Sequence, residues 1–174
     1  MKILVLTGPE SSGKSWLSGL LKEHFGAVVV DEYVRHFIEQ EKRDTTYADI
    51  TPIARGQLAW EDHARAQKPN LLVLDTHLLS NILWSKTLFG QVPDWIEPAL
   101  LARHYDLHLL LSPEGVPWFD DGMRCQPDLN ERQTFYSAAK CWLEAHRKPF
   151  LSIGGSWQQR QQSAFHAVSQ LLNR

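Results

Sequence analysis

Short apolar runs alternate along this chain with longer segments of helical periodicity, and this alternation is the strongest constraint on its fold. The runs are nearly continuous in apolar side chains, as strands covered on both faces should be. They span 3–7, 27–30, 71–74, 107–111 and 150–153. The helical segments span 14–24, 51–67, 77–89, 94–104, 130–146 and 157–172. A repeated strand–helix unit predicts a five-stranded parallel sheet inside a three-layer αβα domain of the α/β class.

Length and composition predict one globular domain over residues 1–174. The chain is 43% hydrophobic and 22% charged, which is ordinary for a globular protein. Its net charge of −2 provides no basic excess for holding a nucleic acid. Cys125 and Cys141 are too few for a disulfide framework, and no apolar run approaches the roughly 20 residues of a membrane span. We expect a cytoplasmic protein with no nucleic-acid partner and no membrane insertion, in an oligomeric state that the sequence leaves open.

One connection, from 112 to about 129, has neither strand nor helix periodicity. An irregular stretch of this length in a compact domain is usually a functional loop, and we expect a lid at about 113–132. Helix boundaries are indicated elsewhere by local residues. Thr51 followed by Pro52 is typical of a helix start, and Ser156 of an N-cap.

A glycine-rich segment joins the first strand to the first helix and matches the pattern G-x-x-x-x-G-K-[ST]. Its residues are Gly8, Pro9, Glu10, Ser11, Ser12, Gly13, Lys14 and Ser15. Glycines allow backbone amides to curl around an anion, and the helix that follows presents its positive end. Lys14 would reach the β- and γ-phosphates, and the Ser15 hydroxyl would hold Mg²⁺. The pattern predicts a P-loop NTPase fold with an ATP phosphate site, in which we include the next residue, Trp16.

The residue after the third strand, Asp75, provides a carboxylate at the sheet edge where ligands of α/β folds bind. We expect it to hold Mg²⁺ through water. A GTPase would need an Asn-Lys-x-Asp segment, which this sequence lacks. Larger ATPase machines carry additional domains, for which a chain of this length has little room. A small kinase with an arginine-bearing lid is the interpretation that remains.

Two lid arginines suit a transferring phosphoryl group, because guanidinium is planar and always charged. We expect a catalytic role for Arg124 and a nucleotide contact for Arg132, with ordinary surface charges as the alternative. Asp31 and Glu32 follow the second strand, where a carboxylate could accept the proton of an attacking ribose-like hydroxyl. Because side chains alternate along a strand, only one of the two should face the site. A solvated acidic turn is the alternative.

Together these residues resemble the ribosylnicotinamide kinase domain of NadR-type NAD-biosynthesis proteins and their stand-alone AAA-like P-loop kinase relatives. The resemblance covers most of the chain and rests on the segments 8–15, Glu32-Tyr33-x-Arg35, Asp75-Thr76 and Trp118-x-Asp120-Asp121-Gly122-x-Arg124. Such relatives transfer the γ-phosphate of ATP to the 5′-hydroxyl of nicotinamide riboside. The resemblance therefore implies ATP and Mg²⁺ as cofactors and a nucleoside-like acceptor. It further implies acceptor contacts for Glu32, Tyr33, Arg35 and Asp121.

The sequence departs from the family pattern at two places where a substrate would be read. Asp31 stands where the family has tryptophan, and His77 stands where it has aspartate. Trp60 could supply a replacement ring, although an aromatic residue on a helix that faces a sheet is more often core. We expect adenine to lie near 155–157. A kinase for another nucleoside or metabolite, and an ATP-binding regulatory module with weak ATPase activity, are the alternatives.

Overall fold

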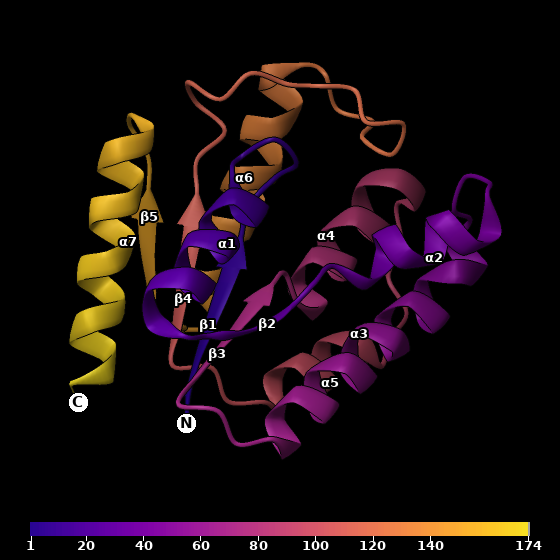
Figure 1. The fold of residues 1–174 in the computed structure, drawn as a ribbon. Helices are drawn as coiled ribbons and strands as arrows, with labels where there is room; N and C mark the ends of the chain where they lie inside the picture. Colours follow the sequence, from indigo (N-terminus) through magenta and orange to yellow (C-terminus); the bar gives the residue numbers. More distant parts are fainter. Residues whose placement is uncertain (174) are drawn as a thin grey trace.

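A five-stranded, all-parallel sheet forms the centre of the computed structural model, which describes residues 1–173 (Figure 1). The strands lie in the order β2-β3-β1-β4-β5, so the first strand is central. Their bounds are Lys2–Thr7 (β1), Val28–Val30 (β2), Leu71–Asp75 (β3), Leu107–Leu111 (β4) and Phe150–Ile153 (β5). All five predicted runs are strands, and the predicted α/β class is confirmed.

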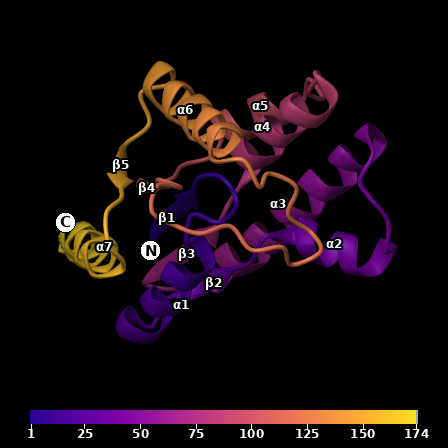
Figure 2. The same ribbon diagram turned by 90° about the horizontal axis from the view of Figure 1, so that it is seen from above.

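Helices cover both faces of the sheet, as the view from above shows (Figure 2). Strand alternation sends Leu4 and Leu6 into an apolar layer with α1 and α7, and Ile3 and Val5 into another with α3 to α6. The bounds are Lys14–Phe25 (α1), Tyr33–Glu41 (α2), Tyr47–Asp49 (η1, a 3₁₀ turn), Ile50–Ala66 (α3), Leu78–Phe89 (α4), Ile96–Leu101 (α5), Leu129–Ala145 (α6) and Trp157–Leu172 (α7).

Two local expectations differ from the structure near the second helix. The sequence interpretation did not include α2, a short helix of nine residues with no buried side chain. The Thr51 N-cap is wrong, because Asp49 and Thr46 form a capping box ahead of the helix. The carboxylate of Asp49 also accepts two hydrogen bonds from Arg43, at 2.7 and 2.9 Å, which lower its pKa. The start of α3 is fixed by this preceding turn.

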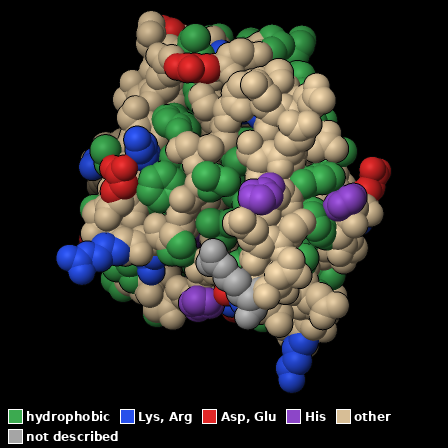
Figure 3. Space-filling model, turned by 90° about the vertical axis from the view of Figure 1, so that its left-hand side faces the viewer, with side chains coloured by type: hydrophobic (Ala, Val, Ile, Leu, Met, Phe, Trp, Pro, Cys, Tyr) green, Lys and Arg blue, Asp and Glu red, His purple; other side chains and the backbone are tan. Residues whose placement is uncertain are grey.

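The last helix, α7, is amphipathic and begins as predicted. The Ser156 hydroxyl accepts a hydrogen bond from the Gln159 amide at 3.3 Å, in a capping box that confirms the predicted N-cap. Glutamines and serines cover much of its outward face, which is mostly tan in the view of this side of the molecule (Figure 3). Among the helices of residues 1–173, none is long and apolar enough to cross a membrane.

Close packing of α2 on α3 yields a stability prediction. A Cβ atom on Gly56 of α3 would collide with the Tyr33 ring of α2, whereas one on Gly19 of α1 would meet nothing within 4 Å. Both glycines are helical, so alanine gains about 0.5–1 kcal/mol of helix preference at each. We expect Gly19→Ala to stabilise the protein and Gly56→Ala to destabilise it by about 1–3 kcal/mol through overpacking. Urea unfolding of both variants measures this, and a Gly56→Ala variant as stable as Gly19→Ala would contradict the packing.

Candidate functional site

The phosphate loop runs from Gly8 to Gly13 between β1 and α1, and its path leaves no room for side chains at its two glycines. Gly8 has φ +143° and Gly13 has φ +90°, a region that favours glycine. A Cβ atom on Gly8 would lie 2.6 Å from the Leu111 carbonyl oxygen, and one on Gly13 would lie 2.7 Å from the Trp157 ring. The loop is therefore fitted tightly between the end of β4 and the start of α7.

Lys14 and Ser15 begin α1 and direct their side chains toward the mouth of this loop. The Lys14 ammonium donates to the carbonyl oxygens of Gly8, at 3.1 Å, and Pro9, at 2.8 Å. The Ser15 hydroxyl donates to Asp75 Oδ2 at 2.8 Å. The predicted partners for a phosphate chain and its cation are thus brought together by β1, α1 and β3.

Asp75 ends β3 and is only 4% exposed. Its Oδ1 atom is one of the buried polar atoms of residues 1–173 with no hydrogen-bond partner. Burial raises the pKa of this carboxyl group, and the charge of Lys14 and the hydrogen bond from Ser15 oppose the rise. A free carboxylate oxygen beside a hydroxyl is a donor set that suits Mg²⁺. Residues 1–173 contain no group of three His, Cys, Asp or Glu side chains placed to hold a metal, so phosphates and water would complete the coordination.

Of the two carboxylates after β2, Glu32 faces the phosphate loop and Asp31 is exposed. Burial raises the pKa of Glu32, and the positive charges of Lys14 and Arg35 oppose the rise. Arg35 Nε lies 3.4 Å from Glu32 Oε2. Only Glu32 lines the larger cavity, but both carboxylates line a smaller one with Ser15 and Asp75, so the expectation that only one of them faces the site holds for the larger cavity alone.

Gln57 of α3 fixes the backbone on both sides of Glu32, a role that the sequence gave no reason to expect. Its Oε1 accepts from the Tyr33 amide at 2.8 Å, and its Nε2 donates to the Asp31 carbonyl at 3.3 Å. Gln57 is only 3% exposed. A polar residue on the buried face of α3, between Ala54 and Glu61, is the one sequence signal that could have indicated it.

The irregular segment 112–128, which contains most of the stretch expected to be a lid, crosses above the phosphate loop, whereas 129–132 of that stretch begin α6 (Figure 1). Glu10 of the loop accepts three hydrogen bonds from it. The donors are the Trp118 indole at 2.7 Å, the Gln126 amide at 2.7 Å and the Cys125 amide at 3.1 Å. The lid is therefore bonded directly to the phosphate loop.

The carboxylate of Asp121 stabilises the turn at the tip of the lid. Asp121 accepts from the Met123 and Arg124 amides, each at 3.1 Å, and its Oδ2 lies 3.2 Å from Arg124 Nε. It also binds Arg35 of α2 at 2.9 Å, and these partners lower its pKa. Sequence reasoning placed Asp121 against the acceptor, and in the structure it joins the lid to α2.

Two further arginines are buried where the lid meets the phosphate loop. Arg132, in α6, is 4% exposed and donates weakly to the carbonyls of Ser11, at 3.4 Å, and Val116, at 3.3 Å. It is therefore not an ordinary surface charge. Arg160 of α7 is 1% exposed and was not predicted as part of the site. It donates 2.7–3.3 Å hydrogen bonds to the carbonyls of Ser12, Ser112, Glu114 and Gly155.

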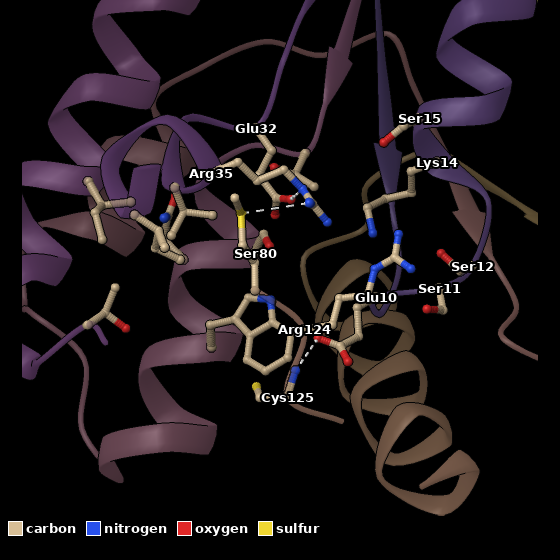
Figure 4. Close-up of a pocket in the computed structure, with 18 of the residues that line it drawn as sticks. Glu10, Ser11, Ser12, Lys14, Ser15, Glu32, Arg35, Ser80, Arg124 and Cys125 are labelled. Carbon is tan, nitrogen blue, oxygen red and sulfur yellow. Dashed lines mark hydrogen bonds and ion pairs between the residues drawn. The ribbon is translucent and has the colours of Figure 1, made fainter. Parts of the chain in front are cut away.

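A cavity of about 660 Å³ lies below the lid, between the phosphate loop and helices α2, α3 and α4. Lys14, Arg35 and Arg124 point into it from different elements (Figure 4). Its far end is mainly apolar, and the residues there are Val34, Ile38, Ile50, Ile53, Trp84 and Phe89. The arrangement offers a polar end for a phosphate chain and an apolar end for a ring.

A second cavity of about 290 Å³ adjoins the first on the other side of Glu32 and Arg35. Asp31 and Trp60 line this smaller cavity, so the structure separates them from the apolar end of the larger cavity, which we call the apolar chamber. Tyr33 lines neither cavity and packs edge-on against Trp60, with ring centroids 4.7 Å apart. The predicted acceptor residues are therefore divided: among them, Glu32 and Arg35 line both cavities, as Ser15 of the phosphate loop also does.

The two tryptophans near the predicted adenine site lie together. Trp16 and Trp157 line the larger cavity with ring centroids 4.6 Å apart, and Trp157 is 43% exposed. His77 is the N-cap residue of α4 and lines neither cavity, although its departure from the family pattern falls where a substrate would be read. His77 is 1% exposed, and its Nε2 lies 3.3 Å from Nε2 of His108 inside the protein.

The sheet order and the phosphate loop define this protein as a P-loop protein of the kinase-like type. Its sequence matches the family model described as an AAA domain over residues 3–160, and the chain belongs to that family.

The chain is 24% identical over 157 residues to the trifunctional NAD biosynthesis/regulator protein NadR of Escherichia coli and, equally, to that of Salmonella typhimurium. Each match covers 88% of this chain and 38% of the relative, so the relatives are much longer. The relationship to NadR-type proteins that the motifs indicated is confirmed, at a distant level.

Solved structures with the same fold include two of NadR. One, in complex with NR, has a TM-score of 0.83 at 20% identity and covers 99% of this chain and 52% of that one. The other, in complex with NAD and AMP-PNP, has a TM-score of 0.77 at 17% identity, covering 99% and 50%. A deoxyadenosine kinase from M. mycoides with bound dATP has a TM-score of 0.66 at 12% identity, covering 97% and 100%.

The four carbonyls bound by Arg160 lead to a prediction for Arg160→Lys. Lysine cannot reach four carbonyls with one ammonium, so buried acceptors lose their partners. We expect the free energy of unfolding to fall by about 1–3 kcal/mol. Arg147→Lys, the same change at an exposed site, should alter it by no more than about 0.5 kcal/mol. Urea denaturation measures both variants, and equal stabilities would contradict this role.

Proposed function

We propose that this protein is an ATP-dependent kinase that phosphorylates the 5′-hydroxyl of a nucleoside, with nicotinamide riboside as the acceptor. One observation carries the proposal: Lys14, Glu32 and Arg124 reach one cavity from the phosphate loop, the end of β2 and the lid. These are a phosphate-binding cation, a partly buried carboxylate and a loop guanidinium, the set that phosphoryl transfer to an alcohol needs.

The donor half of the site follows from the loop. Its amides and the N-terminus of α1 would hold the phosphates of ATP, with adenine beside Trp16 and Trp157. The hydroxyl of Ser15 and Asp75 would hold Mg²⁺, which when bound would neutralise charge on the phosphates. Lys14 would bind the β- and γ-phosphates, and Arg132 would brace the loop through the Ser11 carbonyl.

The acceptor half follows from Glu32. The acceptor hydroxyl would donate its proton to the Glu32 carboxylate while its oxygen bonds to the γ-phosphorus, and the bond to the β-phosphate oxygen would break to release ADP. Arg124 would meet the charge on the transferring group. Gln57 would keep Glu32 in place through the two neighbouring backbone groups.

The choice of acceptor rests on the relatives and on the apolar chamber. A NadR structure of the same fold is a complex with NR, and the chamber between α2, α3 and α4 would accept a ring. Asp31 borders the smaller cavity and not this chamber, so its charge would not contact a ring bound between α2, α3 and α4. Another nucleoside is the second candidate, favoured by the fold shared with deoxyadenosine kinase.

A screen of wild-type protein with MgATP against nicotinamide riboside, deoxyadenosine and the common nucleosides separates these candidates. We expect Lys14→Ala to reduce transfer to the preferred acceptor by at least about 100-fold, because the γ-phosphate loses its cation. Its circular dichroism spectrum should stay native. Lys22→Ala, at an exposed position on the same helix, should keep full activity. Full turnover by Lys14→Ala would refute the assignment.

The raised pKa of Glu32 predicts a pH dependence. Only the ionised carboxylate can accept a proton, and a raised pKa means that ionisation is lost above the ordinary value of 4.5 as pH falls. We expect kcat/KM to decline on acidification with an apparent pKa above 4.5. Glu32→Gln should lose most activity and should no longer show this decline of kcat/KM at low pH (the acid limb of the profile). Asp31→Asn should retain the acid limb. If Asp31→Asn removes the limb and Glu32→Gln does not, Asp31 is the base.

A further inference from the structure

Glu10 occupies a position in the phosphate loop at which the motif allows any residue. Its carboxylate is turned away from the phosphate site and toward the lid, where it accepts the three hydrogen bonds from Trp118, Cys125 and Gln126. All three donors are N–H groups at 2.7–3.1 Å, and the acceptor is a carboxylate, so the bonds are of the stronger, charge-assisted kind.

These donors come from both arms of the lid. Trp118 lies on the arm that leaves β4, and Cys125 and Gln126 lie on the arm that returns toward α6. The segment between them, 119–124, forms the tip that carries Arg124. One carboxylate therefore fixes the two ends of the tip to each other and to the phosphate loop.

The tip is fixed again on the acceptor side. Asp121 binds Arg35 at 2.9 Å, and Arg35 Nε lies 3.4 Å from the Glu32 carboxylate. A chain of contacts thus passes from the phosphate loop through Glu10, the lid and Arg35 to the base proposed above. Its members Glu10, Arg35 and Glu32 line the larger cavity (Figure 4).

From this arrangement, which rests on the proposed function, we propose that Glu10 is a positioning residue that couples lid closure to phosphoryl transfer. By holding both arms of the lid, it places Arg124 over the transferring group and keeps water from the γ-phosphorus. Without it, water can attack the γ-phosphorus in place of the acceptor hydroxyl. The bond to the β-phosphate oxygen then breaks, ADP and inorganic phosphate form, and the proton from water passes to solvent.

The kinetic test compares Glu10→Ala with Glu114→Ala, which removes another lid carboxylate, on an exposed residue, whose contact is a 3.2 Å hydrogen bond from Gln133. With MgATP and nicotinamide riboside, we expect Glu10→Ala to lower the transfer kcat by about 10- to 100-fold. The ratio of inorganic phosphate to phosphorylated nucleoside should rise at least about tenfold, and Glu114→Ala should behave as wild type. Glu10→Gln keeps one acceptor oxygen, so its kcat and its phosphate-to-product ratio should lie between those of wild type and Glu10→Ala.

A second measurement keeps the two proposals distinguishable. Hydrogen exchange of the Cys125 and Gln126 amides, followed with MgATP alone, should be faster in Glu10→Ala than in wild type, with β1 and β3 unchanged. If wild type phosphorylates no nucleoside but the exchange difference is present, the proposed function fails and the contact of Glu10 with the lid stands. Unchanged exchange, or faster exchange with an unchanged phosphate-to-product ratio, would overturn the coupling role.

Discussion

The fit of the phosphate loop between the end of β4 and the start of α7 is the constraint on which the site depends. Gly8 approaches the Leu111 carbonyl and Gly13 approaches the Trp157 ring so closely that neither position has space for a Cβ atom. Arg160 fills the space behind the loop with its four hydrogen bonds to carbonyls. These contacts with β4, α7 and Arg160 hold the loop in shape. Its backbone amide groups can therefore point together at an anion.

Sheet order then decides what faces the loop. With β1 central, its neighbours β3 and β4 bring Asp75 and the base of the lid to the same edge, and β2 follows with Glu32. A parallel sheet gathers the residues after its strands at one edge, so residues distant in sequence form one cavity. The proposed chemistry depends on this gathering and on the charges of Lys14 and Arg35 near the carboxyl groups of Asp75 and Glu32.

Much of this architecture could be predicted from the sequence, because strand periodicity and the glycine motif are local signals. The strands, the loop, Asp75 and the irregular lid segment were all found in this way. Helix α2, the lid contacts of Glu10, and the buried Gln57 and Arg160 were not. Most of the hydrogen-bond partners of Glu10, Gln57 and Arg160 lie 24 to 148 positions away, and no local pattern indicates such contacts. An arginine in line with the apolar face of α7 was the one available signal for Arg160.

The departure from the family pattern at His77 has a structural reason. The Nδ1 atom of His108 lies 3.0 Å from the Pro149 carbonyl, an acceptor only, so its Nε2 accepts from His77. Burial lowers the pKa of both, of His108 to about 4, and the pair stays neutral beside Tyr105 at neutral pH. This residue therefore belongs to the core, and Asp31 is the departure that borders the candidate site.

The central claim is that one cavity holds the nucleotide and the acceptor together. A bisubstrate compound, with adenosine joined through a polyphosphate chain to the 5′-oxygen of nicotinamide riboside, tests it most directly by calorimetry. We expect this compound to bind more tightly than ATP or the nucleoside alone and to displace both. A compound that displaces ATP while leaving nucleoside binding unchanged would contradict a shared cavity.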